Sequence, residues 1–208
     1  MNTINVAQFL QDSAGIKDPQ AAGTLAAHAT VRALAKGEAL LQAGEHQAEI
    51  AVLIDGAVRT ALIDSAGRDT TDCLITKKGM VIAPCADFSR PSPVRIEAII
   101  PSHVASIPIE AVQSLLGTSL PFAHDFIAIL QNAWQMHWDI KTAVCQKTAR
   151  ERYLWFLDAY PGVIDLIPPP LHRIVSRHDA GHPLARTQRG AGGVTRPFPH
   201  GGIAPPMP

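Results

Sequence analysis

The chain has 208 residues, of which 47% are hydrophobic and 17% are charged, and its formal net charge is zero. This length and composition fit a globular protein made of one large domain or two small ones. The balanced charge excludes a protein that is drawn to nucleic acid or membrane by its global charge. No apolar run approaches the roughly 18 residues that a membrane-spanning helix needs, so no such helix is expected.

The cysteines and the first residues indicate a cytoplasmic protein. Cys73, Cys85 and Cys145 lack the spacing of metal ligands and are too few for a disulfide framework, so we expect packed, reduced thiols. The first residues, MNTINVAQFLQDSAG, have no basic stretch followed by a long apolar run. No secretion signal is therefore expected.

Short strands are predicted after a helical lead over residues 1–24, in which a helix covers residues 6–14. In residues 25–118, short apolar runs break at Gly37, Gly44, Gly56, Gly67 and Gly79. Asp55-Gly56 and Ala66-Gly67 are placed at tight hairpin turns, where glycine supplies a positive φ at little cost. Regular short strands of this kind predict an antiparallel sandwich or barrel, which ends in a strand and a short helix at Pro108.

A long helix is predicted for residues 119–147. Its apolar residues step by four and three in a heptad-like seam, which we assign to a dimerisation helix: Phe122, Phe126, Ile129, Ala133, Met136, Ile140 and Ala143. A second apolar stripe lies on a neighbouring face and consists of Ile127, Leu130, Trp134 and Trp138. Either the two form one broad core-facing surface, or one packs on the β-domain while the other pairs with a second chain. A helix with two apolar faces needs two partners, which favours a homodimer.

A shorter helix is predicted within residues 148–168. Thr148-Ala149-Arg150-Glu151 has the pattern of a capping box and starts the helix RERYLWFLDAY. Pro161-Gly162 stops that helix, and the periodicity disappears after Pro168-Pro169-Pro170.

Two stretches carry a resemblance to a known family. KGEALLQAGE followed by IAVLIDGAVRTALIDSAGRD, and further on ERYLWFLDAYPGVIDLIP, resemble parts of the Crp/Fnr family of bacterial transcription regulators. The resemblance covers about residues 25–168. It implies an α+β fold with an antiparallel β-roll of the cyclic nucleotide-binding type (a jelly-roll-like double-stranded β-helix) over residues 25–118. The dimerisation helix over 119–147 and the start of a helix-turn-helix domain over 148–168 follow it.

The resemblance also implies an effector pocket in the β-roll. In members that bind cyclic AMP, a Gly-Glu pair holds the ribose hydroxyl, and an arginine followed by a small hydroxyl residue holds the phosphate. In GMVIAPCADFSRPSPVRIEAI the pair falls on Ala83-Pro84, which has no carboxylate, and Pro91 after Arg90 has no amide to donate. Cyclic AMP is therefore not the expected ligand, although Ser92 and Arg95 are partial substitutes.

The candidate effector pocket consists of Gly79, Ile82, Ala83, Arg90, Ser92 and Arg95. These residues hold another small-molecule effector, or the domain acts without a ligand as an interaction domain. The alternative that Arg90 and Arg95 are ordinary solvated residues stays open. No cofactor is assigned, since three scattered cysteines do not fit the four-cysteine iron–sulfur cluster of the family's redox branch.

Residues 169–208 fit none of these parts and are predicted to be an aberrant, disordered tail. His178 and His182 have the spacing of the H-E-x-x-H zinc motif, but Gly181 and Pro183 oppose a helix and no third ligand follows, so no metal is assigned. An arginine- and glycine-rich nucleic-acid arm is the other reading, but the basic residues are few and Phe198 is the single aromatic. G-x-S-x-G, Walker and C-x-x-C motifs are absent from the sequence, and no enzyme is expected.

The tail also has a reading in another frame. The family resemblance implies a helix-turn-helix after Pro168, and residues 172–186, HRIVSRHDAGHPLAR, contain none. Synonymous codons exist for these residues such that the frame displaced by one base spells IASYLGMTPVTLSR, which resembles the family's helix-turn-helix. The synonymous bases are free, but the first and third positions of each shifted codon are largely set by the residues present. Our hypothesis is a one-base frameshift near residues 168–171, in the gene or in its sequencing.

The sequence therefore predicts a dimeric Crp/Fnr-like transcription regulator that senses a small effector and whose DNA-reading part is defective in this chain. DNA is a partner in the family, and weak or absent specific DNA binding is expected here. The alternative is a stand-alone ligand-sensing or dimerisation module without DNA binding.

Overall fold

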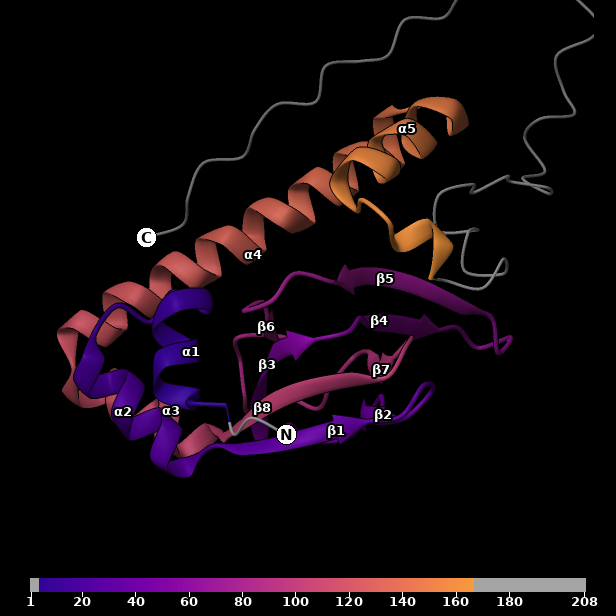
Figure 1. Ribbon diagram of the computed structural model, residues 1–208. Coiled ribbons are helices and arrows are strands. Elements are labelled where there is room, and N and C mark those ends of the chain that lie inside the picture. Colours follow the sequence, from indigo (N-terminus) through magenta and orange to yellow (C-terminus); the bar gives the residue numbers. More distant parts are fainter. Residues whose placement is uncertain (1–3, 167–208) are drawn as a thin grey trace, which may run out of the picture. The chain divides into compact units, whose positions relative to one another are not determined.

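The computed structural model describes residues 4–166, which begin with two short helices (Figure 1). In α1 (Val6–Ser13) the Asn5 side chain caps the first turn by accepting from the Gln8 amide at 3.1 Å. The second helix, α2 (Pro19–His28), follows Asp18 and has proline in its first turn. The sequence predicted α1 but missed α2, whose alanine-rich residues show little apolar periodicity.

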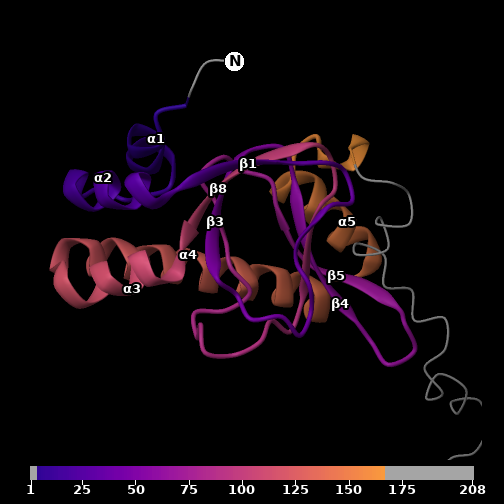
Figure 2. The same cartoon turned by 90° about the horizontal axis from the view of Figure 1, so that it is seen from below.

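Eight strands within the described residues form two antiparallel four-stranded sheets (Figures 1 and 2). The first sheet has the order β1 (Thr30–Leu34), β8 (Ser102–Pro108), β3 (Glu49–Asp55) and β6 (Val81–Ile82). The second has the order β2 (Ala39–Leu41), β7 (Arg95–Ala98), β4 (Val58–Ile63) and β5 (Asp69–Ile75). This arrangement confirms the predicted α+β fold with an antiparallel β-roll.

One of the two predicted hairpins is wrong. Gly67 has a φ of +74° in the turn between β4 and β5, which pair as expected. Gly56, with a φ of +91°, instead joins β3 to β4, and these strands belong to different sheets. A Cβ on Gly56 would lie 2.6 Å from the Ser102 Cα, so glycine also permits a close approach of two backbone segments at this corner.

Three helices follow the roll. After α3 (Ile109–Thr118), the long helix α4 (Leu120–Gln146) starts where the sequence predicts, with Ser119 as its N-cap. The last helix, α5 (Ala149–Ala159), has the predicted capping box: the Thr148 side chain accepts from the Glu151 amide, and the Glu151 carboxylate accepts from the Thr148 amide at 2.8 Å. A 3₁₀ turn at Val163–Asp165 follows.

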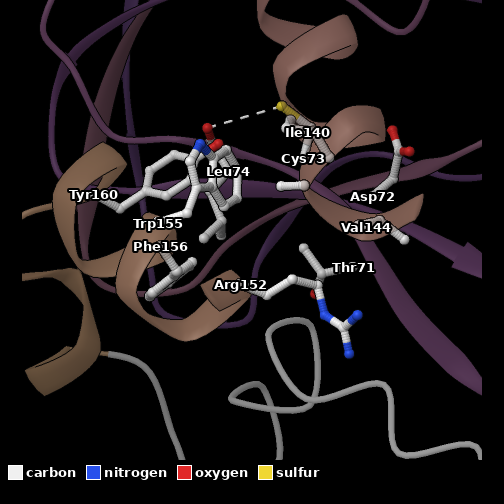
Figure 3. A pocket seen from close by; sticks show the side chains of 11 residues that line it. Thr71, Asp72, Cys73, Leu74, Ile140, Val144, Arg152, Trp155, Phe156 and Tyr160 are labelled. Atoms are coloured by element: carbon white, nitrogen blue, oxygen red, sulfur yellow. Dashed lines mark hydrogen bonds between the residues drawn. The ribbon is translucent and has the colours of Figure 1, made fainter. Parts of the chain in front are cut away.

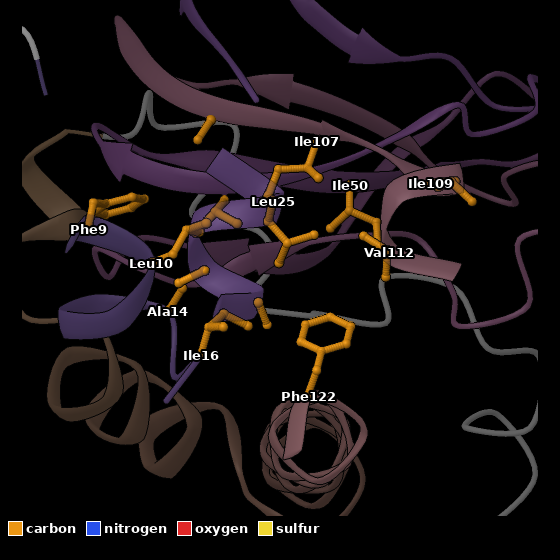
Figure 4. Packing of buried hydrophobic residues seen from close by; sticks show 14 residues of the cluster. Phe9, Leu10, Ala14, Ile16, Leu25, Ile50, Ile107, Ile109, Val112 and Phe122 are labelled. Atoms are coloured by element: carbon orange, nitrogen blue, oxygen red, sulfur yellow. The ribbon is translucent and has the colours of Figure 1, made fainter. Parts of the chain in front are cut away.

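Successive side chains along the strands point to opposite faces of the sheet, which divides the hydrophobic core into layers. Ile50, Val52, Ala105 and Ile107 face α1, α2 and α3, and Phe122 of α4 points into this cluster (Figure 4). Their neighbours Ala51, Leu53 and Val104 face inward and pack with residues of the second sheet inside the roll. A third cluster, with Ala57, Leu74 and Ile99 from the β-roll, lies against Phe156 of α5. Both faces of each sheet are thus at least partly covered.

Candidate effector site

The six predicted pocket residues do not converge on one cavity. Gly79 is buried in the turn before β6 and lies against Ser13 at the end of α1, and its amide donates to the Leu53 carbonyl at 2.8 Å. Its φ of +84° and this contact explain why glycine stands there. Ile82 is buried inside the roll, whereas Ala83 is half-buried in the loop after β6.

The loop between β6 and β7 uses its polar groups on itself. Arg90 is exposed over 79% of its side chain and pairs with Asp87 at 3.1 Å. The buried Ser92 hydroxyl donates to the Val94 carbonyl at 2.6 Å, and the Ser92 amide donates to the Glu45 carbonyl at 2.8 Å. Arg90 therefore has the position of an ordinary solvated residue, and Ser92 secures the contact between this loop and the β2–β3 loop.

Arg95 belongs to a network of charges on the second sheet. Its guanidinium pairs with Glu97 at 2.7 Å, and Glu97 also accepts from the Nε of Arg59 at 2.7 Å. Arg59 is only 5% exposed and makes further bonds to Asp69 at 2.8 Å and Thr71 at 3.0 Å. Burial on its own lowers the pKa of Arg59, but the bonds to Asp69 and Glu97 outweigh it and the pKa is raised. Both arginines are thus already neutralised by carboxylates.

A cavity of about 190 Å³ lies inside the roll, beside the β2–β3 loop. Ile82 is the single predicted pocket residue that lines this cavity. The other lining residues are Leu40, Leu41, His46, Gln47, Ala48, Glu49, Ala51, Ile96 and Ser106. Two buried polar atoms of its lining, Gln47 Oε1 and Ser106 Oγ, have no hydrogen-bond partner among the described residues. Neither residue was predicted from the sequence. The one available signal was a serine at an inward position of the apolar strand β8.

The predicted seam and the second stripe lie farther apart around α4 than the neighbouring faces expected from the sequence. At about 100° per residue, their centres are roughly 140° apart around the helix. The seam faces the chain's own core: Phe122 and Ala143 are buried, Phe126 and Ile129 pack on the outer cluster, Ala133 is half-buried, and Met136 and Ile140 pack on the roll interior. The stripe faces away, and Trp134 is 68% exposed. The seam predicted for dimerisation therefore packs within the chain, and the exposed apolar face of α4 is the second stripe.

A second, small cavity of about 30 Å³ lies between β5, the end of α4 and α5 (Figure 3). Trp155, Phe156 and Tyr160 of the α5 region contribute their rings, and Ile140 and Val144 contribute from α4. Burial raises the pKa of the Cys73 thiol in its wall to about 12, so this thiol stays neutral. Cys73 is packed as predicted and Cys85 is half-buried, but Cys145 is exposed, so the expectation of packed thiols is wrong for Cys145.

The described residues offer no alternative kind of site. No group of three or more His, Cys, Asp or Glu side chains within residues 4–166 is arranged to hold a metal ion. No helix in this part of the chain is long and apolar enough to cross a membrane. The histidine motif at 178–182 and the predicted tail lie outside the described residues.

Comparison with known proteins agrees with this architecture. No protein-family model and no curated protein matches the chain. Among solved structures, FixK2 from Bradyrhizobium japonicum matches with a TM-score of 0.58 and 22% identity, over 63% of this chain and 65% of that one. CLP, the c-di-GMP responsive global regulator of Xanthomonas campestris, matches with a TM-score of 0.57 and 17% identity, over 69% of this chain and 74% of that one. A putative Crp/Fnr-family transcriptional regulator from Eubacterium rectale matches with a TM-score of 0.55 and 14% identity, over 68% and 67%.

The fold is that of a Crp/Fnr-type cyclic nucleotide-binding domain. The predicted family resemblance is confirmed at the level of structure, and the neighbours are regulators, not enzymes. At these identities the likeness concerns the fold, so the ligand has to be argued from this chain's own residues.

Proposed function

We propose that this Crp/Fnr-type β-roll is the effector-sensing and dimerisation part of a cytoplasmic transcription regulator. The observation that carries the proposal is the position of α4. One face of this helix covers the roll and the opposite face is exposed and apolar. A single helix that touches both the sensor and the outside of the chain is suited to transmit a change in the roll.

The exposed stripe of α4 is the proposed dimer interface. Ile127, Leu130, Trp134 and Trp138 are all exposed, and the rings of Trp134 and Trp138 meet edge to face at 6.4 Å. Water-exposed tryptophans in a row are costly to leave uncovered, and their repeat along one helix face fits the same face of a second copy. Closed two-fold pairs are the commonest oligomers among soluble proteins.

Trp134→Glu tests this interface. Size-exclusion chromatography with light scattering should give a dimer for the unchanged chain and a monomer for Trp134→Glu, because two buried charges would face each other. Asn132→Glu is the matched control: it introduces the same charge at an exposed position of α4 away from the stripe and should leave the dimer intact. A dimer that persists in Trp134→Glu contradicts the proposed interface.

The sensing mechanism we propose is a population shift. Met136 and Ile140 pack on the roll interior, while Trp134 and Trp138 lie on the exposed side of the same turns. An effector that binds the roll more tightly in one of two arrangements would favour the matching position of α4 in the dimer. The position of α5, whose Phe156 packs on the second sheet, would change with it.

DNA reading is proposed to be defective in this chain. The support is the sequence of residues 172–186, which lie outside the described residues, and the alternative frame that spells IASYLGMTPVTLSR. The test compares the chain with a variant in which the displaced frame is restored from residue 172 onward. Both are incubated with fragmented genomic DNA at about 150 mM salt, because affinities are salt-dependent.

The restored variant should select specific fragments at nanomolar concentration, and the chain as written should select none. Specific nanomolar binding by the chain as written contradicts the proposed defect. Resequencing the locus is the direct check on the frame: codons 172–186 must yield that peptide when displaced by one base.

The alternative is a stand-alone ligand-sensing or dimerisation module. The observation that favours it is that the β-roll, α4 and α5 share three hydrophobic clusters within residues 4–166. The module would be supported if the chain as written and the restored variant were both dimers and neither selected DNA in the experiment above.

A further inference from the structure

We propose that the cavity beside the β2–β3 loop binds a small, uncharged and largely apolar molecule that carries a hydrogen-bond donor. The proposal gives a ligand class to the sensing role proposed above and rests on it. The site differs from the predicted effector pocket, with which it shares Ile82 alone.

The space itself comes from two small side chains that face each other. Ala51 of β3 and Ser106 of β8 are register partners, and both line the cavity from the inward face of the first sheet. At the neighbouring inward positions Leu53 and Val104 fill the interior. A cavity in a close-packed roll is unusual, because interiors are normally filled to the density of organic crystals.

Two polar atoms define what the cavity recognises. Gln47 is 8% exposed, and its Nε2 donates to the Glu49 carbonyl at 2.8 Å, which leaves Oε1 as an acceptor without a partner. Ser106 is 1% exposed and its Oγ has no partner within residues 4–166. Buried polar groups are almost always paired, and an unpaired one is costly. A ligand with an O–H or N–H group would satisfy the Gln47 acceptor.

The charges around the cavity exclude an anion. Its inner walls are aliphatic side chains: Leu40, Leu41, Ala51, Ile82 and Ile96. Among the described residues, Glu49 is the one carboxylate of the lining and pairs with Arg32 at 3.4 Å, and no lysine or arginine of this part of the chain lines the space. A phosphate would therefore meet a carboxylate and a carbonyl-type acceptor, with no lysine or arginine of residues 4–166 to pair with.

The volume sets the size of the molecule. An apolar cavity of about 150 Å³ is known to accept benzene, so a cavity of about 190 Å³ fits a ring of that size with one polar substituent. A cyclic nucleotide is too large for this space as well as wrongly charged. His46 and Ala48 are exposed at the rim, on the loop whose Gly44 amide donates to the Ser92 carbonyl at 2.8 Å.

Phenol is the probe for the test, with toluene and cyclic AMP as comparisons. The full chain is titrated with each in a thermal-shift assay and by calorimetry. Phenol should raise the melting temperature saturably. Toluene, which has the ring without the donor, should bind about three- to tenfold more weakly, and cyclic AMP should cause no shift.

Variants locate the binding. Ser106→Ala and Gln47→Leu should each reduce the preference for phenol over toluene. Ala51→Leu should abolish binding of both by filling the cavity, whereas Ala33→Leu, the same change at an exposed position of β1, should leave binding unchanged. Circular dichroism establishes whether each variant is folded. If Ala51→Leu is unfolded, the loss of the preference for phenol in Ser106→Ala is the test of the binding site.

Three results overturn the proposal: no shift with phenol or toluene, unchanged phenol binding in folded Ala51→Leu, or a cyclic AMP shift larger than that of phenol. None of them affects the dimer experiment, which needs no ligand. Failure of this ligand class is therefore distinguishable from failure of the proposed regulator.

Discussion

At the scale of single residues, Gly79 illustrates how a position can be important without touching a ligand. It was selected as part of an effector pocket, but its surroundings are the end of α1 and the Leu53 carbonyl. A Cβ there would collide with the Ser13 backbone, and the positive φ disfavours any side chain.

Gly79→Ala is expected to lower the free energy of unfolding by more than about 3 kcal/mol, since strain and a backbone clash act together. Gly67→Ala is the control, because Gly67 has a similar φ of +74° and open space around it, and should cost about 1–2 kcal/mol. Urea unfolding of both variants measures the difference. Equal losses would mean that the contact with Ser13 is unimportant.

Arg59 pairs with both Asp69 and Glu97 and is the centre of the charge network on the second sheet. Arg59→Leu should cost about 3–5 kcal/mol, because it leaves the buried Glu97 with Arg95 as its remaining partner. Arg68→Leu removes an exposed pair with Asp64 and should leave the melting temperature almost unchanged. Thermal unfolding of the two variants at pH 7 gives the comparison, and similar losses would contradict a structural role for the network.

At the scale of elements, local sequence signals predicted where helices begin, but they did not predict which strands pair with each other. Ser119 before α4 and Thr148 before α5 each accept from the amide three residues later, so the sequence alone located both helix starts. Gly56 shows the limit: its positive φ was predictable, but whether β4 pairs with β3 depends on distant strands. The same limit explains why the cavity beside Ser106 was missed, since it depends on Ala51 in another strand.

The capping box of α5 makes this element sensitive to acid. The backbone and side-chain bonds to Thr148 lower the pKa of Glu151 below its usual value. A carboxyl with a lowered folded pKa contributes stability above its unfolded pKa, and that contribution is lost as the pH falls through the folded value. Glu151→Ala should therefore accelerate amide exchange in the first turn of α5 at pH 7, with a difference from the unchanged chain that shrinks below about pH 4. A difference that is the same at both pH values would contradict the assignment.

At the scale of the whole molecule, the exposed stripe on α4 also carries a chemical reporter. Cys145 lies one heptad after Trp138 and is exposed, whereas Cys73 is buried with a raised pKa. In a parallel two-fold pair of α4 helices, the two Cys145 side chains would face each other.

Mild oxidation with diamide should therefore join two chains by a Cys145–Cys145 disulfide, in which two thiols lose two protons and two electrons to the oxidant. Non-reducing electrophoresis detects the product. Cys145→Ser and Trp134→Glu should both prevent it, while Cys85→Ser should not. Efficient cross-linking in Trp134→Glu would mean that the disulfide forms from random collisions.

In the proposed dimer, the two apolar faces of α4 link association to folding of the roll. Phe122, Met136 and Ile140 hold the helix on the β-roll, so a chain whose roll unfolds would also lose the surface proposed to bind its partner. Mass action then stabilises the roll, and its melting temperature should rise as the protein is concentrated. A dimer of this kind would be less stable in dilute solution, so the number of copies in a cell would become one of the quantities that determine how much of the chain is folded.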